Sequence, residues 1–395
     1  MSDLHKAFVK RIKDQERSLG LTSLSEKDEE EQEEEEDEDG DVLSGMTKFG
    51  SRPTIPTVHP LHPLPSSTRA STADQTTVDN YENFKRVHFK VTEKYTRADG
   101  ILSISTYYKP PSSAKDPICI FLHGAGSTAM TFAFLSQSIG EISENTGLFL
   151  FDLRGHGNSS LTKDFSLDAL VEDLHFILNE FIGKHNINSN PIYLVGHSLG
   201  GAISSSFLRK YQMQYPQVKG SVVLDIVEET AVKSLGAMPN FISNRPKSFS
   251  SLTNAIKWHM GFLLYNKASA EVSVPDLFDL ESLTWKTDLA LTQPFWSTWF
   301  DKLSENFLGF RGPKLLILSA HETLDKNLMI GQMQGKYQLV VFSNQQKYGH
   351  FIHEDLPRQV ATCLLDFIKR NEDPDKFMKE ELGIIPKWGG KIHHT

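Results

Sequence analysis

Short apolar runs alternate with longer helical patterns from Phe84 onward, and this alternation restricts the fold more than any other feature of the chain. Candidate strands that are short and mostly apolar lie at residues 87–91, 101–107, 118–122, 148–152, 192–195, 221–225, 315–319 and 339–342. Helical patterns lie between them, as at residues 167–182, 199–211 and 358–370. Continuous apolar strands separated by amphipathic helices are typical of a mostly parallel sheet with helices on both faces. The sequence therefore predicts one α/β domain over about residues 84–370.

One long segment, residues 226–312, interrupts this alternation. Its pattern is mostly helical, and it is rich in aromatic side chains: Trp258, Phe262, Trp285, Phe295, Trp296, Trp299, Phe300 and Phe307. An insertion of this length between two strands is best explained as a cap over one end of the sheet. We therefore expect a helical cap at about residues 227–312.

The net charge of −9 comes from one segment near the N-terminus. Residues 26–41 contain 13 carboxylates and one lysine, so this segment carries −12 and the remaining residues carry +3. Prolines among serines and threonines follow at residues 51–80. Segments with so little apolar surface to bury cannot offset the entropy lost on ordering. We expect residues 1–80 to be a disordered acidic and Pro/Ser/Thr-rich region, and residues 371–395 to be a C-terminal tail.

Several classes of protein are disfavoured by composition. No stretch approaches the roughly 18 apolar residues that span a bilayer, and the N-terminal residues lack the apolar core of a signal peptide. A long basic stripe for nucleic acid is missing. Cys119 and Cys363 each lie in an apolar run and are too few for a disulfide framework. These observations predict a cytoplasmic or nuclear protein that binds neither membrane nor nucleic acid.

A Gly-x-Ser-x-Gly sequence at residues 196–200 marks a candidate nucleophile. It follows the predicted strand at 192–195 directly and begins the helical pattern at Leu199, with the small residues Gly201 and Ala202 where helix and strand approach closely. This setting is the condition for a nucleophile elbow, a strained turn that exposes a serine hydroxyl above the sheet. The sequence therefore predicts that Ser198 is a catalytic nucleophile.

A catalytic serine requires a base, and the base is oriented by a carboxylate. His350 follows the last predicted strand and precedes the last long helix, which places it at the carboxyl edge of the sheet. His353 is a competing histidine closer to the start of that helix. Asp225 and Asp325 are both candidate acids, each following a strand after the elbow. The residues favour Asp225, because a carboxylate in an apolar run requires a partner, but they leave Asp325 open.

The sequence His123-Gly124-Ala125-Gly126 follows the strand at 118–122 and fits an oxyanion loop beside the elbow. The backbone amides of Ala125 and Leu199 are predicted to bind the oxyanion of a tetrahedral intermediate. The segment from Asp152 to Gly157 is interpreted as a structural turn that holds neighbouring loops. No spacing of cysteines and histidines indicates a metal site, and the proposed chemistry needs no cofactor.

Several distinctive segments follow one another along the chain, and their combination is much more specific for one protein family than the elbow alone. They are the elbow at residues 196–203, Leu-Asp-Ile-Val-Glu at 224–228, and residues 245–249, 254–258, 295–296, 299–300, 324–326, 330–336, 350 and 353–355. On these segments the region from about 115 to 369 resembles the protein phosphatase methylesterases. Members of that family are α/β-hydrolases that remove the methyl ester from the C-terminal leucine of the protein phosphatase 2A catalytic subunit.

The resemblance implies an α/β-hydrolase fold and a triad of Ser198, Asp225 and His350, and so it favours Asp225 over Asp325. It implies a serine carboxylesterase whose partner and substrate is the phosphatase 2A catalytic subunit. Two alternatives remain: a general carboxylesterase or lipase, and a phosphatase-binding regulator with secondary esterase activity.

Overall fold

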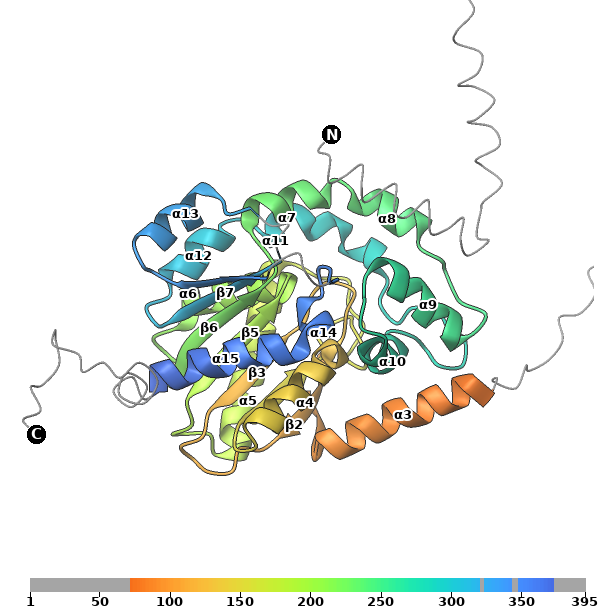
Figure 1. Ribbon diagram of the computed structural model, residues 1–395, viewed down its shortest axis with the longest axis horizontal. Helices are drawn as coiled ribbons and strands as arrows, with labels where there is room; N and C mark the ends of the chain where they lie inside the picture. Colours follow the sequence, from red (N-terminus) through yellow and green to blue (C-terminus); the bar gives the residue numbers. More distant parts are fainter. Residues whose placement is uncertain (1–71, 320–322, 343–346, 373–395) are drawn as a thin grey trace, which may run out of the picture. The chain divides into compact units, whose positions relative to one another are not determined.

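The computed structural model describes residues 72–319, 323–342 and 347–372. Within these ranges the strands form one eight-stranded sheet with the order β1-β2-β4-β3-β5-β6-β7-β8 (Figure 1). The strands are β1 (Val91–Thr96), β2 (Ser103–Lys109), β3 (Ile118–Leu122), β4 (Gly147–Phe151), β5 (Ile192–His197), β6 (Val218–Leu224), β7 (Lys314–Leu318) and β8 (Gln338–Val341). β2 pairs antiparallel with β1 and β4, and the pairs from β4 to β8 are parallel. The prediction of a mostly parallel sheet is confirmed.

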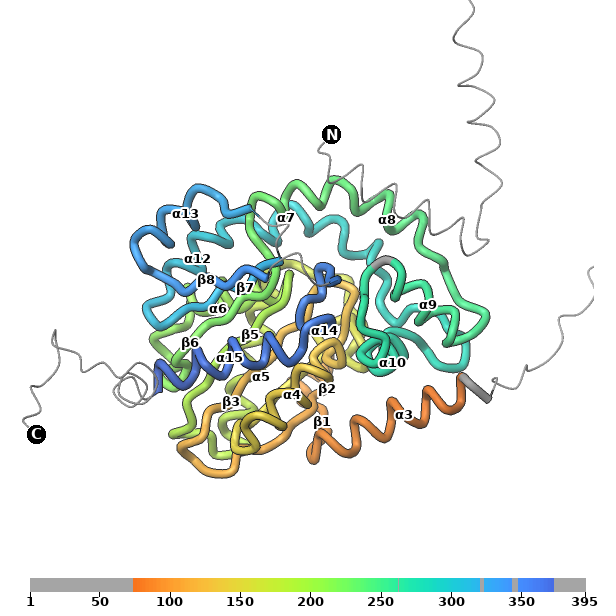
Figure 2. The backbone as a smooth tube through the Cα atoms, in the orientation of Figure 1, coloured from red at the N-terminus to blue at the C-terminus, as the bar shows by residue number. Residues whose placement is uncertain are grey.

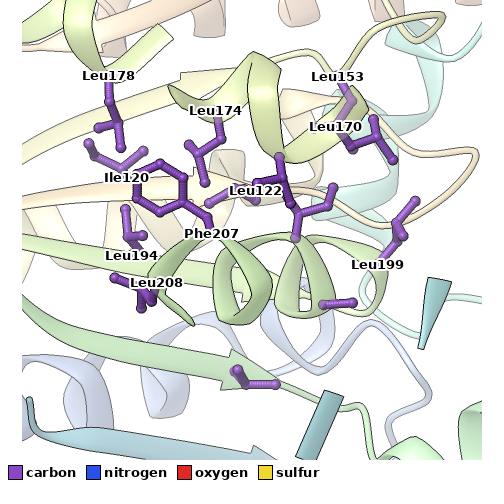
Figure 3. Packing of buried hydrophobic residues seen from close by; sticks show 14 of the residues in the cluster. Ile120, Leu122, Leu153, Leu170, Leu174, Leu178, Leu194, Leu199, Phe207 and Leu208 are labelled. Atoms are coloured by element: carbon purple, nitrogen blue, oxygen red, sulfur yellow. The ribbon is translucent and has the colours of Figure 1, made fainter. Parts of the chain in front are cut away.

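Both faces of the sheet are covered by helices, as the apolar strands require. α5 (Leu167–His185) and α6 (Leu199–Tyr211) pack on one face, and α4 (Ala133–Ile142) and α15 (Pro357–Glu372) pack on the other. β3 shows the reason, because its alternate residues enter the two different apolar clusters on the two faces. Figure 3 shows side chains of α5 and α6 meeting those of β3 in the first cluster.

The segment between β6 and β7 is a helical insertion, as expected from its sequence, and we refer to it as the cap. It contains α7 (Glu228–Leu235), α8 (Met238–Asn244), α9 (Leu252–Phe262), α10 (Lys267–Asp276), the 3₁₀ helix η2 (Leu289–Phe295), α11 (Trp296–Trp299) and α12 (Leu303–Gly309). Part of it has its own apolar core, in which Phe278 and Trp285 lie with their ring centroids 4.4 Å apart. The insertion also reaches the carboxyl edge of the sheet, because a Cβ placed on Gly126 would lie 2.8 Å from Leu289.

The start of the folded region differs from the prediction. Helix α3 (Thr72–His88) includes residues 72–80, for which the sequence predicts a disordered region, and it ends within the segment predicted as a strand at 87–91. Tertiary contacts explain the difference: the Tyr81 hydroxyl donates to Asp276, and Asp74 accepts from the Thr253 amide at 3.0 Å. α3 therefore lies against α9 and α10 (Figure 2). Val78, Tyr81 and Phe84 lie at helical spacing and pack against the apolar clusters, but they are few among polar residues, and the prediction missed them. The acidic segment and the tail beyond residue 372 lie outside the described residues.

Buried histidines make the stability of the fold sensitive to acid. Desolvation by burial lowers the pKa of several histidines: His156 and His259 to about 4, His353 to about 3, and His123 and His197 well below the ordinary value. Burial acts oppositely on Asp152 and Glu354, whose pKa rises to about 7. Between pH 6.5 and about 4 the five histidines bind protons in the unfolded chain but not in the folded chain. The two carboxyls do the opposite, because they hold protons in the folded chain, but they are fewer and offset only part of the difference in bound protons. The free energy of unfolding should therefore fall as pH falls through this window, by about 1.4 kcal/mol per pH unit for each net proton.

Urea unfolding followed by tryptophan fluorescence across this window tests the expectation. His259→Leu removes one buried histidine from the insertion, so the slope of stability against pH should decrease by about one proton, or about 1.4 kcal/mol per pH unit. An unchanged slope in this variant would contradict the assignment of His259 as a neutral histidine in the folded state.

Candidate active site

Ser198 lies in a strained turn between β5 and α6. Its backbone has φ 52° and ψ −120°, a conformation that is rare and costly for a residue with a side chain. The two flanking glycines are required by close backbone contacts. A Cβ on Gly196 would lie 2.3 Å from the Gly200 oxygen, and a Cβ on Gly200 would lie 2.1 Å from the Leu122 oxygen. The turn therefore has the geometry of a nucleophile elbow.

Asp225 and His350 form a hydrogen-bonded pair at the same edge of the sheet. Asp225 follows β6 directly, and its Oδ2 lies 3.0 Å from His350 Nδ1. Its other oxygen, Oδ1, accepts from the Ser319 amide at 2.6 Å. The Asp225 side chain is 2% exposed and that of His350 is 42% exposed, so the carboxylate lies behind an imidazole that reaches solvent. The partner that the apolar sequence around Asp225 required is therefore His350.

Asp325, the alternative acid, has a different position. It is the N-cap of α13 (Lys326–Met333), where its Oδ1 accepts from the Leu328 amide at 2.9 Å. Its other oxygen accepts from the Ser304 hydroxyl. The residue begins a helix, and its side chain is buried. Its carboxylate binds α12 and α13, and the imidazole of His350 is paired with Asp225 instead.

The loop after β3 lies against the elbow. A Cβ on Gly124 would lie 3.1 Å from the Cβ of Ser198, so this loop passes beside the serine. Its shape is fixed by two histidines. His123 Nε2 accepts from the Leu153 amide at 2.9 Å, and His156 Nε2 accepts from the Gly126 amide at 3.0 Å. Ala125 lies between these fixed points, and Leu199 begins α6 on the other side of Ser198.

The turn from Asp152 to Gly157 supports this loop through the Leu153 amide and the His156 side chain. Asp152 accepts from the Ala129 amide at 2.8 Å through Oδ1 and from the Asn158 amide at 2.9 Å through Oδ2. The interpretation of this turn as structural agrees with these contacts, because both oxygens of the carboxylate bind backbone.

His353, the competing histidine, is fully buried, and its Nε2 lies 2.8 Å from the Thr131 hydroxyl. Sequence reasoning missed the polar residues around it, including Glu354, Asp355 and His197. The available signals were the place of His197 within the Gly-x-Ser-x-Gly sequence and the presence of 353–355 among the segments of the family resemblance. Neither signal indicates the contacts of these residues, because their partners are distant in sequence.

No cluster of three metal-ligating side chains occurs among the described residues. His59, His62, His393 and His394 lie outside those residues. In the part of the chain that the structure describes, no helix is long and apolar enough to cross a membrane.

The fold and the elbow are those of an α/β-hydrolase. Residues 119–362 match the model of the alpha/beta hydrolase family. The solved structure of E-2-(acetamidomethylene)succinate hydrolase shares the fold, with a TM-score of 0.57 and 17% identity over 70% of this chain and 99% of that chain.

Two relatives define the family more narrowly. The Candida albicans protein named protein phosphatase methylesterase 1 is 53% identical over 100% of both chains. The Saccharomyces cerevisiae protein of the same name is 36% identical over 87% of this chain and 89% of the relative. The chain belongs to the protein phosphatase methylesterase family and is an esterase.

Proposed function

We propose that the chain is a serine carboxylesterase that demethylates the C-terminal leucine methyl ester of the protein phosphatase 2A catalytic subunit. The observation that carries the proposal is the pairing of Asp225 Oδ2 with His350 Nδ1 at 3.0 Å, at the sheet edge that carries the strained Ser198. Full-length similarity to relatives named protein phosphatase methylesterase 1 supports a methyl ester on a protein phosphatase as the substrate.

The proposed reaction has two acyl-transfer steps. His350 takes the proton of Ser198 as the hydroxyl attacks the ester carbonyl, and His350 then protonates the departing methanol. Water repeats the sequence on the acyl-enzyme and releases a free carboxylate. Asp225 keeps the proton of the imidazole on Nδ1, which leaves Nε2 to act as the base.

The backbone amides of Ala125 and Leu199 are proposed to bind the oxyanion. Leu199 is the first residue of α6, so its amide lies at the positive end of the helix dipole. Because His156 holds the next amide of the loop, that of Gly126, the loop keeps one shape during the reaction. A preorganised donor of this kind contributes about 10²- to 10³-fold in rate.

Substrate choice is proposed to come from the cap and from residues 324–336. The cap reaches the oxyanion loop through Leu289, so a peptide tail bound at Ser198 would contact the cap and the oxyanion loop. We propose that the cap and residues 324–336 form a groove that suits a peptide tail better than a small acyl chain.

Two assays separate this proposal from its rivals. A general carboxylesterase would hydrolyse small esters but would not demethylate the intact phosphatase. If the protein were a binding regulator, the wild-type protein and the Ser198→Ala variant would change phosphatase activity in cells by the same amount. The proposed enzyme should demethylate the intact phosphatase, and Ser198→Ala should lose both the demethylation and its effect on phosphatase activity.

The acidic segment should have little part in this reaction. Residues 26–41 carry −12, whereas the rest of the chain carries +3, so the acidic field belongs to a separate segment. Deletion of residues 1–71, which retains α3, should leave the rate of demethylation and its salt dependence unchanged. The measurement is the demethylation rate at two salt concentrations, and a weaker salt dependence in the deletion variant would instead assign the segment a steering role.

A further inference from the structure

The loop that carries His350 is held on both sides by side chains, one from the elbow and one from the short helix that follows the loop. His197 Nε2 lies 2.9 Å from the backbone oxygen of His350. On the other side, the Gly349 amide donates to Asp355 Oδ2 at 2.9 Å. The backbone on both sides of the His350 side chain is therefore fixed by a hydrogen bond.

The hydrogen bond from His197 has a defined direction. The His197 side chain is 1% exposed, and desolvation by burial lowers its pKa well below the ordinary value, so the imidazole is neutral. Its Nδ1 has no hydrogen-bond partner among the described residues. A buried N–H without a partner is costly, so the single proton is on Nε2 and is donated to the His350 oxygen. The ring also packs against those of His350 and His353, with centroids 4.6 and 4.4 Å away.

Asp355 ties the same loop to the cap. Its Oδ1 accepts from the amides of Tyr265 and Asn266 at 2.7 and 3.1 Å, in the turn between α9 and α10. Its Oδ2 binds the amide of Gly349. One carboxylate therefore joins the residue before His350 to a turn of the cap.

A buried network holds the helix beneath the loop, α14 (Ile352–Asp355). The Thr131 hydroxyl donates to Glu354 Oε1 at 2.6 Å, and the Ser269 and Ser273 hydroxyls donate to Oε2 at 2.9 and 2.6 Å. Because Thr131 donates its only proton to Glu354, it accepts from His353 Nε2. Four hydrogen bonds thus fix α14 between the core and α10, and the loop before it has little freedom.

We propose that His197 and Asp355 are positioning residues that hold the imidazole of His350 within reach of Ser198. The inference rests on the proposed function, because it concerns how His350 acts as the base. Neither residue touches the reacting atoms. Their effect is on the backbone of His350, and a displacement of about 1 Å in a catalytic group lowers a rate by about 10²-fold.

Two substitutions of His197 separate the hydrogen bond from packing. The side-chain amide of glutamine reaches the position of His197 Nε2 and carries a donor, whereas methionine has similar length without a donor. His197→Met should lower kcat for a small activated ester by about 10- to 100-fold, with KM changed only a few-fold. His197→Gln should recover most of this loss. A fluorophosphonate that labels Ser198 counts active sites, so kcat is expressed for each folded site.

Asp355→Asn provides an independent variant in case His197→Met does not fold. Asparagine keeps an oxygen for the Tyr265 and Asn266 amides but turns an amide N–H toward the N–H of Gly349. It should lower kcat for each labelled site by about 10-fold or more, with little change in KM. Equal kcat per labelled site for wild type, His197→Met and Asp355→Asn would overturn this inference while leaving the proposed function intact. A wild-type protein that hydrolyses no ester would instead overturn the proposed function, and this inference with it.

Discussion

Replacement of Ser198 by alanine is expected to reduce kcat for ester hydrolysis by about 10⁶-fold, as in other serine hydrolases. The reason is that the hydroxyl is the only group that forms the acyl-enzyme, so its loss removes the nucleophile and leaves only binding and the oxyanion hole. The measurement is steady-state turnover of a methyl ester by the purified variant.

Ser204→Ala is the matched control. Ser204 lies on the same helix, α6, is buried, and donates its hydroxyl to the Gly201 oxygen at 3.1 Å. Loss of that bond costs about 1 kcal/mol of stability and should leave kcat within a few-fold of wild type. A Ser198→Ala variant that retains a tenth of the wild-type activity would show that another residue is the nucleophile.

The second large effect on kcat is expected from substitution of Asp225, and it distinguishes Asp225 from Asp325 as the catalytic acid. Asp225→Asn should lower kcat by about 10⁴-fold. Asparagine keeps an oxygen for the Ser319 amide and turns its amide N–H toward His350 Nδ1. That nitrogen must then be an acceptor, so the proton moves to Nε2 and the imidazole cannot take the proton of Ser198.

Asp325→Asn makes the same chemical change where no such effect is expected. Asparagine is as good an N-cap as aspartate, and the Ser304 hydroxyl can rotate to accept from the new amide. Activity should stay within about 10-fold of wild type, because the change lies away from the hydrogen bond between Asp225 and His350. If Asp325→Asn lost more activity than Asp225→Asn, the assignment of the acid would be reversed. The test is kcat for both variants with the same ester.

The elements that could be predicted from sequence are those with a strong local signal, such as a continuous apolar run or a motif that begins a helix. The strand at 118–122 has the predicted bounds because both of its faces are buried, and the helix at 199–211 begins at the elbow as expected. Helix α3 was missed because its apolar residues are few, and much of its order comes from contacts with the cap. Local sequence contains no information on such contacts.

The residues of the site also divide into those predicted from local sequence and those that depend on contacts distant in sequence. Ser198 could be predicted from a local motif, because the strained turn requires glycines at fixed positions. The choice between Asp225 and Asp325 depended on which carboxylate meets His350, a contact between residues 125 positions apart. The hydrogen bond between Thr131 and Glu354 joins residues 223 positions apart, and for that reason the buried network could not be predicted from sequence.

We propose that this esterase acts on the methylated C-terminus of the phosphatase 2A catalytic subunit. The most direct measurement is to incubate the purified protein with carboxymethylated phosphatase 2A and to follow the C-terminal peptide by mass spectrometry. The wild-type protein should convert the methyl ester to the free acid, and the Ser198→Ala variant should leave the ester fully intact. Retention of the ester with a wild-type preparation that hydrolyses a small ester would contradict this proposal.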